Sequence, residues 1–289
     1  MSATILIKPE KKTGKKLTIK DVLPEELSWG ISDAYGRLEE GKEGEYTIVF
    51  DPENIGRGFQ IKLDGTTTEI HLNYFNSRHD IELCYMMVER ICRLQGIDTF
   101  IHEDETVRLD RIEPTIQREI EVCADSLSIA AEKVSQENTE TLTVFAVVHP
   151  LDIGKKEIAL FGSDIDKYSE WLNEKQQIDV YYGVPHFYEK DDGSTFGAYA
   201  LRADVASVMP VKPSMPINMK DQFEVSNWYV MLGYSDDSDS GKSDGLKVID
   251  YSGLAKHIQN GEYYDANHVI VRLTDSDVDA LLKEHRVTL

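Results

Sequence analysis

The spacing of apolar residues along the first half of the chain predicts short strands followed by two long helices. Strands are indicated where β-branched, aromatic and other apolar residues alternate with polar ones between turn residues, at positions 3–7, 16–22, 46–50, 59–63 and 67–74. Asp64-Gly65 is a tight-turn pair between the last two segments. We therefore expect an antiparallel meander.

Two helices are predicted after this meander. Ser77 with Asp80 three residues later resembles a capping box, and the apolar residues that follow recur at helical spacing up to Gly96, a common helix terminator. The second helix is predicted to begin near Pro114, and its apolar residues repeat every three or four positions until Ser135. The first helix is apolar around most of its circumference, so we expect it to be buried between layers.

The second half mixes strands and helices without the regular alternation of a parallel α/β fold. Segment 142–148 has almost no polar interruption, which predicts a central strand, and Ser163 is placed to cap a helix. Further elements are predicted at 187–189, 195–201, 228–232, 252–258, 269–273 and from Thr274 or Ser276 onward. We predict an α+β fold of antiparallel sheets with packed helices, in two domains of residues 1–140 and 141–289.

A short internal echo connects these predicted domains. Ile7-Lys8-Pro9 is followed by Gly14-Lys15-Lys16, and Val148-His149-Pro150 by Gly154-Lys155-Lys156, each time ahead of another apolar alternation. Both copies have a strand, a proline, a turn and a second strand in the same order, so one hypothesis is an old duplication. The spacings differ by one residue and nothing else aligns, so coincidence is the alternative.

Charge and cysteine content narrow the classes of function. The chain has 31 basic and 52 acidic residues, a net charge of −21, which disfavours nucleic-acid binding because that depends on lysine and arginine. The first twenty residues, with six lysines and one glutamate, are interpreted as a lysine-rich loop between two short strands that keeps an exposed edge unpaired, with the steering of an anion or a nucleic acid as the alternative. No apolar run or signal-peptide pattern predicts a membrane or secreted protein. Three cysteines without a CxxC motif indicate reduced thiols, so we expect a cytoplasmic protein.

One segment suggests a ligand site. Gly56-Arg57-Gly58 begins like a dinucleotide-binding fingerprint, but Ile61 occupies the third glycine position and a strand follows instead of a helix. A guanidinium between two glycines is still suited to binding an anion. We therefore consider an anion or small-ligand site at Arg57, Arg78 and His79, against a turn that merely needs glycine backbone angles.

No other motif predicts catalysis, a metal or a cofactor. The acidic loop that begins at Asp236 matches a calcium loop only in part, because Lys247 stands where position 12 requires a glutamate. The eight histidines are scattered, and neither HExxH nor GxSxG occurs. We expect no catalytic residue, no metal site and no cofactor.

Aromatic residues gather in the second half, where ten of the fourteen tyrosines lie beyond residue 140. Side chains with an apolar body and a polar tip suit an interface, although any half-buried sheet uses the same composition. The predicted hairpin is our candidate interaction surface, with Tyr181, Tyr182, Phe187, Tyr188, Phe196 and Tyr199.

Three short segments resemble a family of uncharacterised domains of unknown function from Gram-positive bacteria, of similar length. They are Thr4-Ile5-Leu6-Ile7 with its lysine-rich sequel, Ile55-Gly56-Arg57-Gly58-Phe59, and Asn76-Ser77-Arg78-His79-Asp80. The resemblance covers mainly the first hundred residues. It implies a bacterial protein and assigns no activity, cofactor or catalytic residue.

The sequence has clear signals for helices, strands and turns, but no set of titratable residues that would meet at one site. This favours a non-enzymatic binding or interaction protein, one that self-associates or binds a protein partner. The alternative is an enzyme or small-ligand-binding protein with its site near Arg57, Arg78 and His79. A third hypothesis is an acidic inhibitor of a basic partner, based on the net charge.

Overall fold

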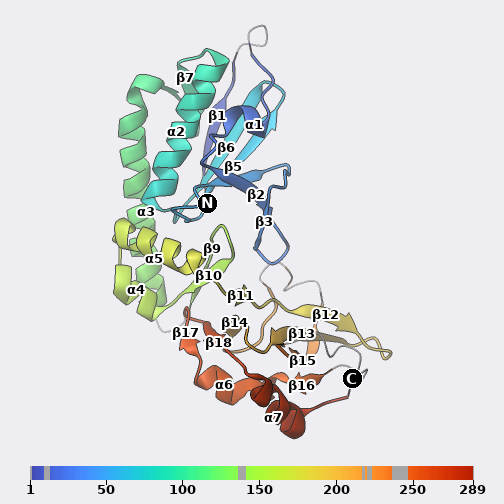
Figure 1. Ribbon diagram of the computed structural model, residues 1–289. Helices are drawn as coiled ribbons and strands as arrows, with labels where there is room; N and C mark the ends of the chain where they lie inside the picture. The colour runs from blue at the N-terminus through green and yellow to red at the C-terminus, as the bar shows by residue number, and fades with distance from the viewer. Residues whose placement is uncertain are drawn as a thin grey trace. The chain divides into compact units, whose positions relative to one another are not determined.

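The computed structural model describes residues 2–9, 14–135, 141–216, 219, 223–235 and 247–288. It contains two compact units, Met1–Gln177 and Ile178–Leu289 (Figure 1). The sequence placed a boundary near residue 140, whereas the units divide after Gln177. The reason is that two helices after residue 154, α4 (Lys155–Phe161) and α5 (Ile165–Gln177), pack on helix α3 (Ile112–Ser135) of the first unit.

The first unit contains an eight-stranded antiparallel sheet. Its strands, in spatial order, are β3 (Leu38–Glu40), β2 (Ser28–Ser32), β4 (Thr47–Phe50), β5 (Phe59–Asp64), β6 (Thr67–Asn73), β1 (Ser2–Ile7), β7 (Thr99–His102) and β8 (Glu105–Arg108). Strand β1 lies inside the sheet, between β6 and β7. The predicted meander is β4–β5–β6, and β2, β3, β7 and β8 extend it.

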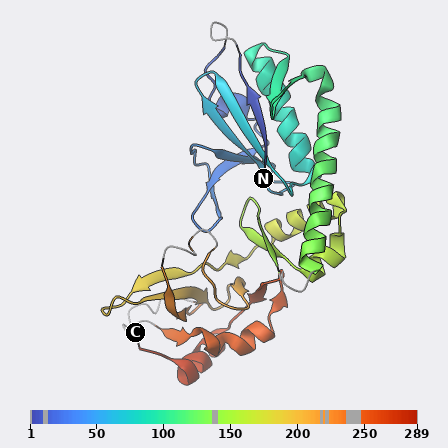
Figure 2. The same cartoon turned by 180° about the vertical axis from the view of Figure 1, so that it is seen from behind.

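Helix α2 (Arg78–Gln95) covers the sheet and packs on β1 and β7, while α3 packs on α2 (Figures 1 and 2). The sheet presents alternate residues to this layer: Ile5 and Ile7 in β1, and Ile70 and Leu72 in β6, are almost completely buried. Such alternation gives each strand one apolar face. The remaining elements of the unit are α1 (Ile19–Val22), the short helix η1 (Leu109–Arg111) and the hairpin of β9 (Leu142–Phe145) and β10 (Pro150–Ile153).

Local signals predicted both long helices correctly. Ser77 caps α2 by accepting a hydrogen bond from the Asp80 N–H, and Gly96 ends it in a left-handed conformation with φ of 70°. Helix α3 begins at Ile112 and ends at Ser135.

Three strand predictions in the first unit were wrong. Segment 16–22 contains α1 and no strand. Strand β9 pairs only with β10 in a two-stranded sheet and is not central, and Val144 is its one buried residue. Residues after Gly154 form α4, so the second copy of the echo is helical and the hypothesis of duplication gains no support.

The second unit is built from two four-stranded sheets. One has the order β11 (Tyr181–Tyr182), β14 (Ser207–Pro210), β18 (His268–Val271) and β17 (Glu262–Tyr263). The other has the order β12 (His186–Glu189), β13 (Thr195–Arg202), β15 (Val225–Gly233) and β16 (Val248–Asp250). All neighbours are antiparallel except the parallel pairs β11–β14 and β13–β15.

Helices complete this unit. Short helix η4 (Tyr251–Leu254) runs into α6 (Ala255–Gln259), and α7 (Asp275–His285) starts at the cap residue Thr274, as predicted. Apolar residues of β13 and β15 pack with those of η4, β18 and α7 in one core. The acidic loop considered as a calcium site, from Asp236 onward, lies outside the described residues. The fold class is α+β with largely antiparallel sheets, as the sequence predicted.

Candidate functional site

The predicted anion site lies where the loop after β4 meets the start of α2. Asp80 is fully buried there, and its Oδ2 accepts hydrogen bonds from the Arg57 N–H at 2.8 Å and from the Ser77 hydroxyl at 2.8 Å. Ser77 Oγ also accepts from the Asp80 N–H at 2.9 Å. Asp80 therefore binds a side-chain hydroxyl and a distant loop, whereas an ordinary capping box binds the backbone of its own helix.

Gly56 makes this approach possible. A Cβ atom at position 56 would overlap Asp80 Oδ2 and lie 2.8 Å from Ser77 Oγ. Burial raises the pKa of Asp80, although the N–H groups of Arg57 and Gly58 and the Ser77 hydroxyl act in the opposite direction. Asp80 forms no ion pair with any residue in the described ranges, and its Oδ2 is held by neutral donors inside the first unit.

The Arg57 side chain is engaged with backbone carbonyls. Its Nε donates to Phe145 O at 2.9 Å and its Nη1 donates to Tyr74 O. Burial lowers the pKa of Arg57, and it forms no ion pair with any residue that the structure describes. The guanidinium therefore joins the end of β6 to β9 and has two of its five donors committed to the fold.

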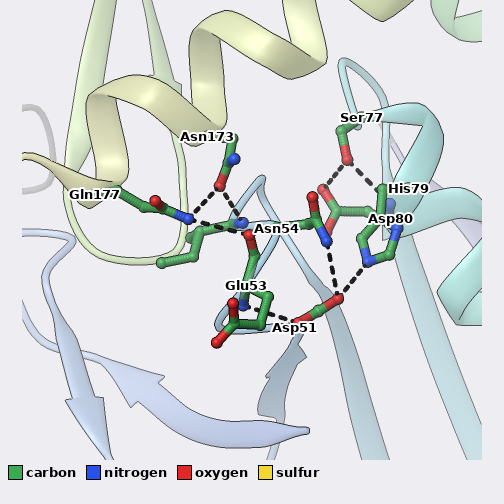
Figure 3. A network of polar contacts seen from close by, with 9 residues as sticks. Asp51, Glu53, Asn54, Ser77, His79, Asp80, Asn173 and Gln177 are labelled. Atoms are coloured by element: carbon green, nitrogen blue, oxygen red, sulfur yellow. Dashed lines mark hydrogen bonds and ion pairs between the residues drawn. The ribbon is translucent and has the colours of Figure 1, made fainter. Parts of the chain in front are cut away.

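Arg78 and His79 have separate carboxylate partners. Arg78 Nε lies 2.5 Å from Asp166 Oδ1, and this hydrogen bond raises the pKa of Arg78. His79 Nε2 lies 2.8 Å from Asp51 Oδ2, as Figure 3 shows. The three predicted residues are thus neighbours around one junction, but their side chains point to different partners and do not converge on a shared space.

A wider polar network fixes the loop in place. Asn173 Oδ1 accepts from the Ile55 N–H at 2.8 Å and from Gln177 Nε2 at 2.9 Å, and Gln177 Nε2 also donates to Glu53 O at 3.0 Å (Figure 3). Asp51 accepts from the Glu53 N–H at 2.8 Å. These contacts attach the loop to α5 as well as to α2. The polar residues of the network therefore have a structural role, which is to hold the loop.

The cysteines are not placed for nucleophilic chemistry. Cys84, Cys92 and Cys123 are all buried and free. Burial raises the pKa of each thiol, that of Cys92 to about 12, so the thiols stay protonated at neutral pH. Buried free thiols of this kind pack as small apolar core residues.

The six aromatic residues of the predicted interaction surface lie on different faces. Tyr199 is buried in the core of the second unit, and Phe187 packs edge-on against Trp228 at 6.0 Å between ring centroids. On the opposite face of the sheet, Tyr188 stacks on Phe196 at 5.3 Å. The remaining two residues, Tyr181 and Tyr182, form β11 of the other sheet.

A pocket of about 780 Å³ opens in the second unit. Its volume falls within the range of about 300–1,000 Å³ that is typical of small-molecule sites. The lining comes from four segments, Val211 and Pro213, Ser226 to Trp228, Asp250 to Ser252, and Ala255, Ile258 and Gln259. Apolar and aromatic side chains are mixed with hydroxyl, amide and carboxylate groups.

Trp228 is the largest side chain of the lining, and a glycine in the neighbouring strand makes room for it. Gly197 is the register partner of Trp228 in the parallel pair β13–β15, and a Cβ atom there would overlap the benzene ring of the indole. Tyr251 is fixed beside it by a hydrogen bond from its hydroxyl to Pro210 O at 2.5 Å. Contacts with strand β13 and with the end of strand β14 therefore fix the positions of Trp228 and Tyr251 in the pocket.

The sequence analysis missed this pocket. It named Trp228 only as the start of a strand and did not single out Asp250. The available signal was Gly197, because a glycine inside an otherwise apolar strand often marks the close approach of another group. The four lining segments are too far apart in the chain for local patterns to connect them.

Fold and site together define an acidic α+β protein with an aromatic-lined pocket. The chain belongs to the family described as Domain of unknown function (DUF4299), whose profile matches residues 2–281. The predicted resemblance to a family of unknown function is thereby confirmed, and it extends over both units. No curated protein and no solved structure matches the chain. None of the helices in the described ranges has the length and apolar content needed to cross a membrane.

Proposed function

We propose that this protein binds a small molecule in the pocket of the second unit and is not an enzyme. The observation that carries the proposal is the pocket itself, about 780 Å³ in volume and lined by Trp228 and Tyr251. Few concave sites of this size occur in one protein, and a largely apolar lining with a few polar groups is the usual composition of a ligand site.

The polar groups of the pocket support binding over catalysis. Asp250 and Ser252 are hydrogen-bonded to each other, with Asp250 Oδ1 accepting from the Ser252 N–H at 2.9 Å and from its hydroxyl at 2.5 Å. Among the lining residues that the structure describes there is no histidine, cysteine or lysine. The described lining thus offers mainly shape and hydrogen bonds, with Asp250 as its one charged group.

The earlier candidate at Arg57, Arg78 and His79 receives less support as a ligand site. Each side chain already has a partner within the first unit, so an incoming anion would have to displace Asp166 or Asp51, or break hydrogen bonds to backbone carbonyls. We retain it as an alternative site whose occupation requires rearrangement of the loop.

A fluorescent neutral probe tests the pocket. Nile red should brighten on binding to the wild-type protein, and Ala255→Phe, which fills the pocket from α6, should weaken that binding at least tenfold. Ala280→Phe is the matched control, because Ala280 is an exposed alanine of α7 outside the lining. Equal binding by the two variants, or no binding by the wild type, would overturn the proposal.

Self-association through β12 is the second candidate function. This strand is at the edge of its sheet and carries Tyr188, which exposes 41% of its surface. A mass in solution above the 32.8 kDa of one chain supports this candidate, and a monomer at all concentrations rejects it. The acidic-inhibitor hypothesis rests on the net charge alone, and a cytoplasmic location on the three free cysteines.

A further inference from the structure

We propose that the ligand of the second unit's pocket is a small organic cation, an ammonium or guanidinium group on an apolar body. This inference rests on the proposed function and specifies its ligand class. Two features of the lining carry it: a single carboxylate, Asp250, and the indole of Trp228.

Asp250 is the only charged residue among the described residues that line the pocket. It is the last residue of β16 and the cap residue of η4, and its Oδ1 accepts hydrogen bonds from the Ser252 N–H and hydroxyl. It forms no ion pair with any residue in the described ranges. The carboxylate is therefore oriented by neutral donors and faces no cation among the described residues, which leaves it able to pair with a cationic ligand group.

Trp228 supplies the second half of the recognition. Its indole is half-buried in the lining and is positioned over Gly197 by the register of β13 and β15. Tryptophan is the aromatic side chain that attracts cations most strongly, and the attraction increases where water is excluded. The apolar lining residues Val211, Pro213 and Ile258 suit the hydrocarbon body of such a ligand.

The charge of the whole protein acts in the same direction. At −21 the chain repels anions and raises the local concentration of cations. This long-range effect is not specific to the pocket, so the experiment has to separate it from the contribution of Asp250. Salt weakens the long-range effect, because the Debye length falls from about 30 Å at 0.01 M to about 8 Å at 0.15 M.

Three probes with one apolar body make the test. 4-Phenylbutylamine, 4-phenylbutanol and 5-phenylpentanoate share a phenylbutyl body and carry a positive, neutral or negative end group at neutral pH. Titration calorimetry at 0.15 M salt should rank their affinities as amine, then alcohol, then acid, with the amine at least tenfold tighter than the alcohol.

Asp250→Asn is the decisive variant. Asparagine is as good a helix cap as aspartate, so the substitution removes the charge and keeps the local structure. The amine should lose about tenfold in affinity, and the alcohol should bind as before. Asp191→Asn removes the same charge from the exposed turn of the β12–β13 hairpin, outside the pocket, and should leave all three affinities unchanged.

The outcomes distinguish this inference from the proposed function. If the alcohol binds as tightly as the amine, or if Asp250→Asn leaves the amine unaffected, the ligand is not selected as a cation, although the pocket still binds. If none of the three probes binds the wild-type protein, both the ligand class and the pocket proposal are overturned. An equal loss in Asp250→Asn and Asp191→Asn would assign the preference to net charge and also overturn the inference.

Discussion

The close approach of Gly56 to Asp80 makes a sharp prediction about stability. In Gly56→Ala the added methyl group overlaps Asp80 Oδ2, so either the loop or the carboxylate must move. Oδ2 of the fully buried Asp80 then loses its hydrogen bonds from the Arg57 N–H and the Ser77 hydroxyl, both 2.8 Å long. Each buried group left without a partner costs about 1–3 kcal/mol. We therefore expect Gly56→Ala to lower the free energy of unfolding of the first unit by about 3–5 kcal/mol.

Urea unfolding followed by tryptophan fluorescence measures this change. In a Trp228→Phe background the remaining tryptophans, Trp29 and Trp171, both belong to the first unit and report on it alone. Gly65→Ala is the matched control, because its Cβ atom would meet nothing within 4 Å although φ is 63°. That variant incurs only backbone strain, about 1 kcal/mol.

Asp80→Ala provides a second test of the same reasoning. Removing the carboxylate removes the atom with which the new methyl group collides, so the double variant should be more stable than the sum of the two single changes predicts. A coupling energy of at least about 1 kcal/mol is expected for groups in direct contact. Equal costs for Gly56→Ala and Gly65→Ala, or additive single changes, would refute the assigned role of Gly56.

Two further predictions concern pH. Burial raises the pKa of Asp80 in the folded state, so its contribution to stability is complete below the unfolded pKa of about 3.9 and is lost as pH rises through the folded pKa. Asp80→Asn cannot titrate and should gain stability relative to wild type between pH 3 and 7; parallel curves from urea unfolding would contradict this. For Asp51, partial burial raises the pKa, but hydrogen bonds from the Glu53 N–H, Asn54 and His79 outweigh it and the net shift is downward. The contribution of Asp51 to stability is present above about pH 4 and is lost as pH falls. His79→Ala should therefore flatten the acid limb of a stability–pH curve. An unchanged limb would exclude the Asp51–His79 pair as its source.

The sequence predicted correctly those helices and strands that are determined by residues close to them in the chain. Helix α2 was predicted with nearly correct ends because Ser77 and Gly96 act within one turn of its backbone. Strands β2 and β3 were missed because Ser28–Ser32 has a glycine at its centre and Leu38–Glu40 has a single apolar residue, so neither shows the alternation that predicts a strand. Strand β9 was placed at the centre of a sheet because an apolar run shows burial but not which partner provides it.

The candidate sites show the same division. Gly56-Arg57-Gly58 was singled out for its composition, and the structure supplies a reason for Gly56 in the approach of Asp80. The contacts of Arg57 with Tyr74 and Phe145 depend on residues distant in the chain, which one sequence does not reveal. The pocket in the second unit is assembled by tertiary structure from segments between 211 and 259, so composition alone gave no sign of it.

The order in which the chain visits the two sheets of the second unit makes their folding inseparable. The chain enters one sheet with β11, the other with β12 and β13, returns with β14, leaves again for β15 and β16, and closes the first with β17 and β18. A cut between β14 and β15 would give two fragments, each with two strands of each sheet, that could pair only through β14–β18 and β13–β15. Neither fragment can complete a sheet alone. We therefore expect the two fragments to fold only when they reassemble, which restores both sheets at once.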